Sequence, residues 1–259
     1  MKTRKKYLNA TTLKIIAVVL MVFDHIHQMW AFEGAPIWLA WLGRPVFPIF
    51  LFAMAESFHY TRNRKKLMLR LLFASCFMTI VNLGLGMLLP NENVVLANNA
   101  FSTFFMATLY MLFWDLLIDG IKKRNGKKII LSILLCIVPI LAAMPILLIM
   151  TVEAPPLWLV RTLFLIPNIL LVEGGFLMVL LGVLFYIFRN RRWIQLLTLA
   201  VVSAITFIVQ GPSSFQWMMV FAAIPIFFYN GEKGRGMKNF FYIFYPAHIY
   251  LLYIITTLT

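Results

Sequence analysis

Apolar runs of about 20 residues, the length that a helix needs to cross a bilayer, follow one another along almost the whole chain. Only helices and closed barrels satisfy their backbone polar groups inside lipid, and runs of this length indicate helices. The 62% hydrophobic and 12% charged residues exclude a soluble enzyme, a disulfide scaffold and a disordered chain. We therefore predict an all-α, multi-pass membrane helical bundle that forms a single domain over residues 1–259.

The sequence predicts about nine membrane spans. The sixth is too long for one ordinary span, and Pro167 and the run Glu173-Gly174-Gly175 interrupt it. We expect one span there, preceded by a re-entrant or interfacial segment. The predicted spans are Thr12–Phe32, Ile37–Phe58, Leu67–Leu89, Ala97–Ile118, Ile129–Met150, Leu157–Phe188, Trp193–Gln210, Ser214–Tyr229 and Lys238–Leu258.

Basic residues occur in every second segment between these spans. All but four of the 23 lysines and arginines precede the first span or follow the second, fourth, sixth and eighth. The alternate segments contain Glu33, Glu92 and Glu153 and no basic residue. The positive-inside rule then places the N-terminus in the cytoplasm and, with nine spans, the C-terminus outside. Topology explains the net charge of +14, so we predict the lipid bilayer as a partner and no nucleic acid.

Ionisable residues inside the apolar segments are costly, at about 2.5–3.5 kcal/mol each on insertion scales, so each needs a partner, water or a function. Arg70 and Asp115 lie near span ends, where their charges reach the interface. An interfacial position is an equal explanation for Arg161, and it also suits His27 and His59. The remaining residues of this kind are Lys14, Asp24, His25, Arg44, Glu56, Glu173 and His248.

Lys14 and His25 are predicted to share one face of the first span. They are eleven positions apart, which is about 1100° of helix and within about 20° of complete turns. The rise between them is roughly 16 Å at about 1.5 Å per residue. A cation near the cytoplasmic edge and an imidazole past the membrane centre are more typical of a cavity than of a lipid-facing surface.

Arg44, Glu173 and His248 are predicted to reach the depth of His25. Tyr245-Pro246 precedes the second imidazole and removes a backbone donor. Two imidazoles, carboxylates and an arginine at one depth could supply a general base, a group that orients the base and an oxyanion stabiliser. Asp24 points about 100° away from its neighbour His25, so Glu173, Glu56 or His248 could orient the imidazole instead. A charge-compensated helix cluster and a proton relay in a transporter remain alternatives.

Ordered blocks of residues from the first span to the last form a family pattern. They are Leu13–Ala17 through Met21 to Asp24-His25, Gly43-Arg44-Pro45, Phe47–Phe50, Glu56, Thr61-Arg62, Arg70-Leu71, Asn99, Phe101–Thr103, Glu173-Gly174, Gln216-Trp217, Tyr229–Gly234, Lys238, Phe241-Tyr242 and Tyr245–His248. In this order they resemble the TraX family of bacterial conjugal-transfer membrane proteins, which are F-pilin acetylases of the plasma (inner) membrane.

The resemblance implies an acetyltransferase that moves an acetyl group from cytoplasmic acetyl-CoA to an acceptor outside, the N-terminal amine of a pilin or another exported peptide. TraX proteins are similar to a larger superfamily of integral-membrane acyltransferases, whose first helix has an arginine and a catalytic histidine separated by ten residues. Lys14 and His25 have that separation here, and lysine lacks the bidentate fork of arginine. The predicted count of about nine spans is another departure from the superfamily, which commonly has ten.

On this interpretation His25 is the general base and Arg44 the oxyanion stabiliser. The catalytic candidates are His25, Asp24, Arg44, Glu173 and His248. The donor-binding candidates are Lys14, Arg62, Lys233, Lys238 and Tyr245. Lys233 lies in a glycine-rich turn that suits an anion. The alternatives are O-acetylation of a surface glycan, a proton-coupled transporter and a structural membrane partner.

The sequence predicts no metal site. His25 and His27 lie on different sides of a helix, and neither cysteine is near them by spacing. Cys76 and Cys136 both lie in apolar runs, so no disulfide framework is indicated.

Overall fold

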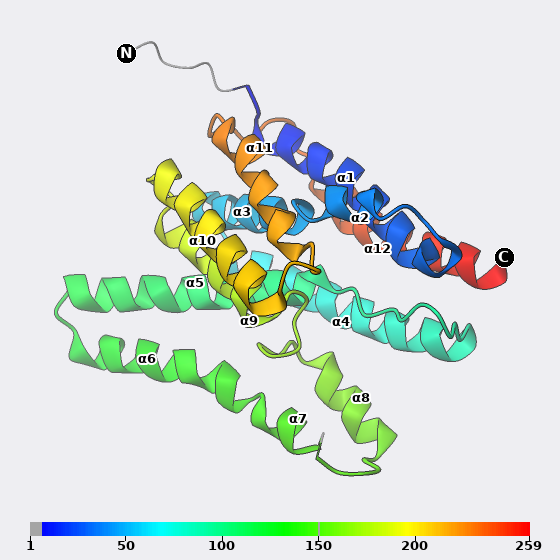
Figure 1. The fold of residues 1–259 in the computed structure, drawn as a ribbon. Coiled ribbons are helices and arrows are strands. Elements are labelled where there is room, and N and C mark those ends of the chain that lie inside the picture. Colours follow the sequence, from blue (N-terminus) through cyan, green and yellow to red (C-terminus); the bar gives the residue numbers. More distant parts are fainter. Residues whose placement is uncertain (1–6, 150) are drawn as a thin grey trace.

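The computed structural model describes residues 7–149 and 151–259, apart from the side chains of Trp158 and Lys238. Every regular element within these residues is a helix (Figure 1). The elements are α1 (Ala10–Trp30), the 3₁₀ helix η1 (Ala31–Glu33), α2 (Trp38–Gly43), α3 (Val46–Tyr60), α4 (Arg64–Leu88), α5 (Ala100–Lys122), α6 (Gly126–Leu141), α7 (Met144–Ile149), α8 (Leu157–Leu165), α9 (Gly175–Ile187), α10 (Arg192–Gln210), the 3₁₀ helix η2 (Gln216–Ala222), α11 (Ala223–Phe227) and α12 (Lys238–Leu258).

Seven helical segments among the described residues are long and apolar enough to cross a membrane. Two further apolar segments, Gly175–Ile187 and Gln216–Phe227, are shorter. The prediction of an all-α, multi-pass chain is therefore confirmed, while the count of nine spans and the sides of the termini stay predictions. The seven long segments are Ala10–Glu33, Trp38–Tyr60, Arg64–Leu88, Ala100–Lys122, Gly126–Ile149, Arg192–Gln210 and Asn239–Leu258.

The sixth predicted span is broken, as its sequence indicates. Helix α8 ends at Leu165, a non-helical segment follows, and α9 begins at Gly175. Gly174 and Gly175 have φ values of +74° and +66°, which glycine adopts without a steric penalty. The break places Glu173 in the segment that leads into α9 rather than in the middle of a helix.

Three other predicted spans contain a break: Ile37–Phe58, Ile129–Met150 and Ser214–Tyr229. The first two still correspond to single membrane-crossing segments, Trp38–Tyr60 and Gly126–Ile149. The first divides into α2 and α3 at Arg44-Pro45, because proline has no backbone N–H and is favoured only where a helix begins. Ile129–Met150 divides into α6 and α7 at Ala142-Ala143. Ser214–Tyr229 consists of the 3₁₀ helix η2 followed by the short α11. In each case a hydrophobic run alone does not reveal the break.

The core of the bundle forms around α3, which packs against α1, α5 and α9. Gly182 of α9 allows this approach, since an added Cβ would lie 3.1 Å from Leu51 of α3 and 3.2 Å from Ala107 of α5. Helix α6 packs along α5 and does not belong to this core. Helices α7 and α8 continue from the end of α6, on the side of the bundle away from α10 and α11 (Figure 1).

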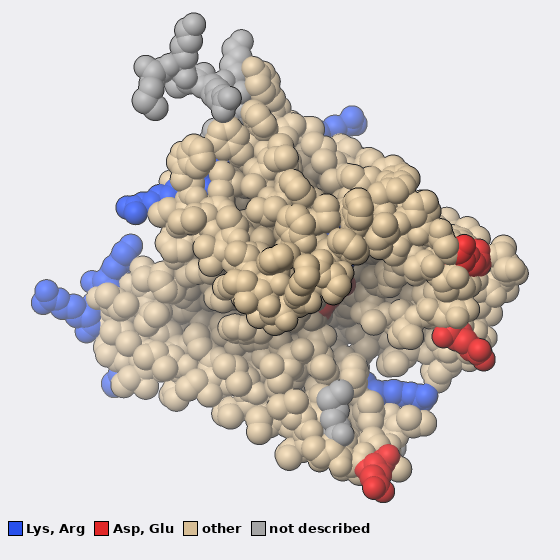
Figure 2. Space-filling model, viewed as in Figure 1, with Lys and Arg blue, Asp and Glu red and all other residues tan. Residues whose placement is uncertain are grey.

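Charged side chains are segregated along the bundle. Figure 2 shows most of the visible Lys and Arg groups at one end and most of the visible acidic groups at the other. The first end is that of the α5–α6 turn, where Lys123 and Lys128 pair with Asp119 at 2.8 Å and 2.6 Å. This arrangement agrees with the alternation of basic segments in the sequence.

The start of α1 is joined to the glycine-rich turn that precedes α12. The backbone N–H of Ala10 donates to the carbonyl of Glu232 at 2.8 Å. The Thr11 hydroxyl lies 3.0 Å from the carbonyl oxygen of Lys233 and 2.6 Å from that of Arg235. These contacts connect residues more than 220 positions apart and hold α1 beside α12.

Candidate active site

A cavity of about 790 Å³ lies between α1, α3, α12 and the ends of several other helices. Ligand pockets of proteins are commonly about 300–1,000 Å³. From α1 it is lined by residues at helical spacing that include Lys14, Met21, His25 and Gln28. From Lys14 to Gln28 the lining extends over roughly 21 Å of helix at about 1.5 Å per residue. The prediction that Lys14 and His25 share a cavity-facing side of the first span is confirmed.

His25 is directly hydrogen-bonded to His248. Nδ1 of His25 lies 2.6 Å from Nε2 of His248, and Nδ1 of His248 lies 2.7 Å from the carbonyl oxygen of Phe244. The exposed fractions of the two histidines are only 5% and 8%. The rings of Phe244, His248 and His25 pack one after another with centroid separations of 4.8 Å, which fixes their orientation.

The carbonyl of Phe244 determines where the protons of this pair lie. A carbonyl oxygen only accepts, so Nδ1 of His248 carries a proton and, in the neutral ring, Nε2 is an acceptor. Nδ1 of His25 must then be the donor, which leaves the lone pair on Nε2 of His25. Among the described residues no group donates to that nitrogen, and His25 lines the cavity. His25 therefore has the tautomer that a general base requires, with an acceptor nitrogen at Nε2.

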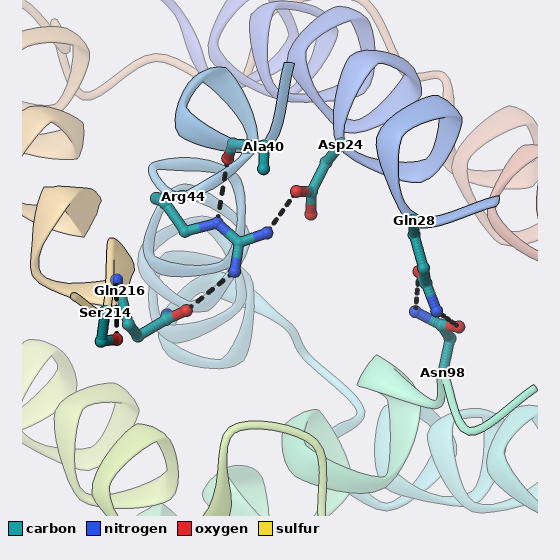
Figure 3. A network of polar contacts seen from close by, with 7 residues as sticks. All are labelled: Asp24, Gln28, Ala40, Arg44, Asn98, Ser214 and Gln216. Atoms are coloured by element: carbon teal, nitrogen blue, oxygen red, sulfur yellow. Dashed lines mark hydrogen bonds and ion pairs between the residues drawn. The ribbon is translucent and has the colours of Figure 1, made fainter. Parts of the chain in front are cut away.

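Arg44 and Asp24 form an ion pair on the cavity wall (Figure 3). Nη2 of Arg44 donates to Asp24, Nη1 donates to Oε1 of Gln216 at 3.0 Å, and Nε donates to the carbonyl of Ala40 at 2.9 Å. Gly43 permits this contact, since a Cβ there would collide with the Asp24 carboxylate. Asp24 thus fixes Arg44 and does not orient His25.

A reciprocal amide pair lies beside this group (Figure 3). Gln28 and Asn98 each donate to the other, at 2.9 Å and 3.0 Å, and both line the cavity. Gln210, Ser214 and Gln216 line it as well. This end of the cavity is therefore rich in uncharged hydrogen-bonding groups, and a sequence search for ionisable residues overlooks them. The sequence does hold one indication of Gln28: it lies three residues after His25 and therefore on the same face of the first helix.

Glu173 is held at the N-terminus of α5. Its Oε2 accepts the backbone N–H of Asn99 at 2.7 Å and the hydroxyl of Tyr245 at 3.1 Å. Thr103 donates to the backbone carbonyl of Glu173 at 2.7 Å, and the Tyr245 oxygen accepts the N–H of Ala100 at 2.9 Å. Glu173 and Tyr245 both line the cavity, but the carboxylate does not contact either histidine.

Lys14 provides a positive charge at the opposite end of the cavity from Gln28. Its Nζ lies 5.5 Å from the centre of the Phe241 ring, within cation–π range. Among the described residues no carboxylate pairs with it. The neighbouring Tyr242 has a buried hydroxyl without a hydrogen-bond partner in that same part of the chain, and it lines the cavity too. This end can accommodate an anion.

Three of the five predicted donor-binding residues are not placed on the cavity. Arg62 and Lys233 are exposed and do not line it, although Lys233 is near enough to repel Lys14. The side chain of Lys238 lies outside the described residues. Tyr245 lines the cavity, where it bridges Ala100 and Glu173 rather than presenting a free hydroxyl.

Two acidic residues that the sequence singles out belong to a separate polar cluster. Glu56 is buried near Arg192 and Tyr229, and it does not line the cavity. Asp115 accepts from Arg64 and from the hydroxyl of Tyr186, each at 2.5 Å. Neither residue orients His25, and that role falls to His248.

Within residues 7–149 and 151–259, no three or more His, Cys, Asp or Glu side chains are grouped so that they could hold a metal ion. A family model described as TraX protein covers residues 9–256. No curated protein and no solved structure is matched by the chain.

Proposed function

Because this chain belongs to the TraX protein family, and is thus a membrane protein related to conjugal transfer, we propose that it is a membrane-embedded acetyltransferase. It moves an acetyl group from cytoplasmic acetyl-CoA to an acceptor at the outer side of the bacterial inner membrane. The acceptor is the N-terminal amine of a pilin or of another exported peptide. The observation that carries the proposal is the lone pair on Nε2 of His25 at the wall of a long cavity, set by the bond to His248.

The donor end is the one lined by Lys14. The 3′-phosphate and diphosphate of CoA require positive charge, and the unpaired Lys14 ammonium supplies it as a point charge. The pantetheine arm extends along the α1 face past Val18 and Met21, which are apolar. The rise of roughly 16 Å from Lys14 to His25 suits an arm of that length.

The reaction takes place between His25 and Arg44. The acceptor nitrogen attacks the thioester carbonyl carbon while Nε2 of His25 removes its proton. The imidazolium keeps its Nδ1–H bond to His248, which stabilises the ring in the reactive orientation. Arg44 uses three of its five N–H groups in the contacts described, so two remain for the oxyanion. Collapse of the intermediate breaks the C–S bond, and His25 returns the proton to the CoA thiolate.

The end of the cavity lined by Gln28, Asn98 and Gln210 receives the acceptor. Its amide groups can pair with the N–H and C=O groups of a peptide backbone. The same groups suit sugar hydroxyls, so O-acetylation of a surface glycan is the second candidate. A proton-coupled transporter is the third, because the cavity follows α1 for much of its length.

The first test is calorimetric titration of the detergent-purified protein with acetyl-CoA. We expect saturable binding that Lys14→Ala weakens by at least tenfold and His25→Ala leaves within about threefold. Lys65→Ala is the matched control, since this exposed lysine lies away from the cavity. Folded protein that does not bind millimolar CoA would overturn the proposal, and solute flux driven by a pH gradient would favour the transporter.

A further inference from the structure

The two carboxylates that line the cavity differ in their partners. Asp24 is neutralised by Arg44. Glu173 forms no ion pair within the described residues, and its two hydrogen bonds both go to Oε2, from Asn99 and Tyr245. Its Oε1 receives no hydrogen bond from the described chain. A carboxylate on a cavity wall with one unoccupied oxygen is suited to a cationic ligand.

Glu173 and His25 have Tyr245 as a common neighbour. Tyr245 connects the two, because its hydroxyl donates to Glu173 at 3.1 Å and its ring centre lies 6.4 Å from that of His25. A group bound at Oε1 of Glu173 therefore lies in the same cavity that His25 lines, with Tyr245 between the two residues. The other charged or titratable groups that face Glu173 are Asp24 on α1, Arg44 at the α2–α3 turn and Tyr245 on α12.

The chemistry of the acceptor decides what such a carboxylate is needed for. An alcohol loses one proton when it is acetylated, and the CoA thiolate takes that proton up, so the general base is regenerated. A peptide amine enters as an ammonium, because its ordinary pKa is about 7.7–8.0. It must lose one proton to become nucleophilic and a second when the C–N bond forms. Acetylation of an ammonium therefore releases one net proton, which His25 alone cannot accept and recycle.

We propose that Glu173 binds the acceptor ammonium and takes up its first proton, leaving the second to His25. The inference rests on the proposed acetyltransferase function and adds a residue that selects amines over alcohols. The ammonium donates to Oε1 of Glu173, transfers a proton to it, and becomes a free amine. Its nitrogen then forms the C–N bond, the C–S bond breaks, and the second proton passes through Nε2 of His25 to the thiolate. Glu173 afterwards releases its proton to water.

The test compares Glu173→Gln with the wild type on two acceptors in detergent. One is a short alanine peptide with a free N-terminal amine, and the other is the same peptide with lactate in place of its first alanine, which offers a hydroxyl. Glutamine keeps an oxygen that accepts from Asn99 and Tyr245, so the loop contacts are retained. The rate is the release of CoA thiol, measured at pH 6.8 and pH 8.8, and each value is divided by that of the wild type.

We expect the variant to transfer to the amine about tenfold more slowly than the wild type at pH 6.8, where only about a tenth of the amine is free, and to recover most of this loss by pH 8.8. Transfer to the hydroxyl peptide should stay within about twofold. A changed titration of His25 would alter the ratio for both acceptors, so the comparison between acceptors separates that effect from loss of the ammonium-binding carboxylate.

Thr103→Val is the control for a purely structural role, because it removes the bond to the Glu173 backbone and keeps the carboxylate. Equal losses on both acceptors, or a loss in Thr103→Val of the same size and pH dependence, would overturn the assignment of Glu173. A wild type that acetylates neither peptide would instead refute the proposed function, and the inference with it.

Discussion

Replacement of His248 by phenylalanine tests whether the second imidazole sets the proton of the first. Phenylalanine keeps a ring of similar shape, so stacking between Phe244 and His25 is preserved. It offers no acceptor, so the Nδ1–H of His25 loses the partner that lies 2.6 Å away. His25 can then keep its reactive tautomer only with a buried, unpaired donor.

The magnitude follows from that lost partner. An unsatisfied buried donor costs about 1–3 kcal/mol. If this cost falls on the reactive tautomer, and about 1.36 kcal/mol corresponds to a tenfold change in rate, transfer slows by about 5- to 160-fold. Acetyl-CoA binding should change by less than about threefold, since Lys14 and the α1 face are untouched.

Two measurements check this expectation. Stopped assays of thiol release give the rate, and ¹⁵N NMR of histidine-labelled protein reports whether Nδ1 or Nε2 of His25 carries the proton. The control is His59→Phe, because His59 does not line the cavity. A His248→Phe protein that is folded and retains at least half the wild-type rate would refute the positioning role. So would a wild-type His25 with its proton on Nε2.

Three further expectations follow from the packing and the charge pattern. Gly43→Ala should lower the stability of the purified protein by about 1–3 kcal/mol, because the added Cβ displaces Asp24, whereas Gly126→Ala, whose Cβ meets open space, should not lower its thermal midpoint. Tyr245→Phe leaves the N–H of Ala100 without its acceptor and should lower the stability of the protein by about 1–3 kcal/mol. A denaturant titration measures this loss, and an unchanged midpoint would count against the hydrogen bond. A periplasm-dependent reporter fused after residue 259 should be active, and activity of a cytoplasm-dependent reporter there would show that the predicted topology is wrong.

The features that could be predicted from the sequence are those set within a single helix or a single loop. The common face of Lys14 and His25 follows from helical geometry, and both line the cavity. The break around Glu173 follows from its glycines. These features are local, so spacing and residue type are sufficient.

Features that depend on contact between helices were not predictable. Asp24 pairs with Arg44 only because α2 turns back against α1 at Gly43. The imidazole partner of His25 comes from the last helix, and the sequence alone did not decide whether Glu173, Glu56 or His248 orients His25. The amides of Gln28 and Asn98 carry no charge, so hydropathy does not distinguish them from solvated surface.

The bonds between the start of α1 and the turn before α12 have a consequence for biogenesis. The first helix reaches the membrane long before its partners exist, since 222 residues separate Thr11 from Lys233. At a synthesis rate of about 5–20 residues per second, that interval is on the order of 10 to 45 s. His25 and His248 are separated by 223 residues, so the base gains its partner at the same late stage. A nascent chain that lacks the last helix therefore has neither the bonds that secure the start of α1 nor the His25–His248 pair.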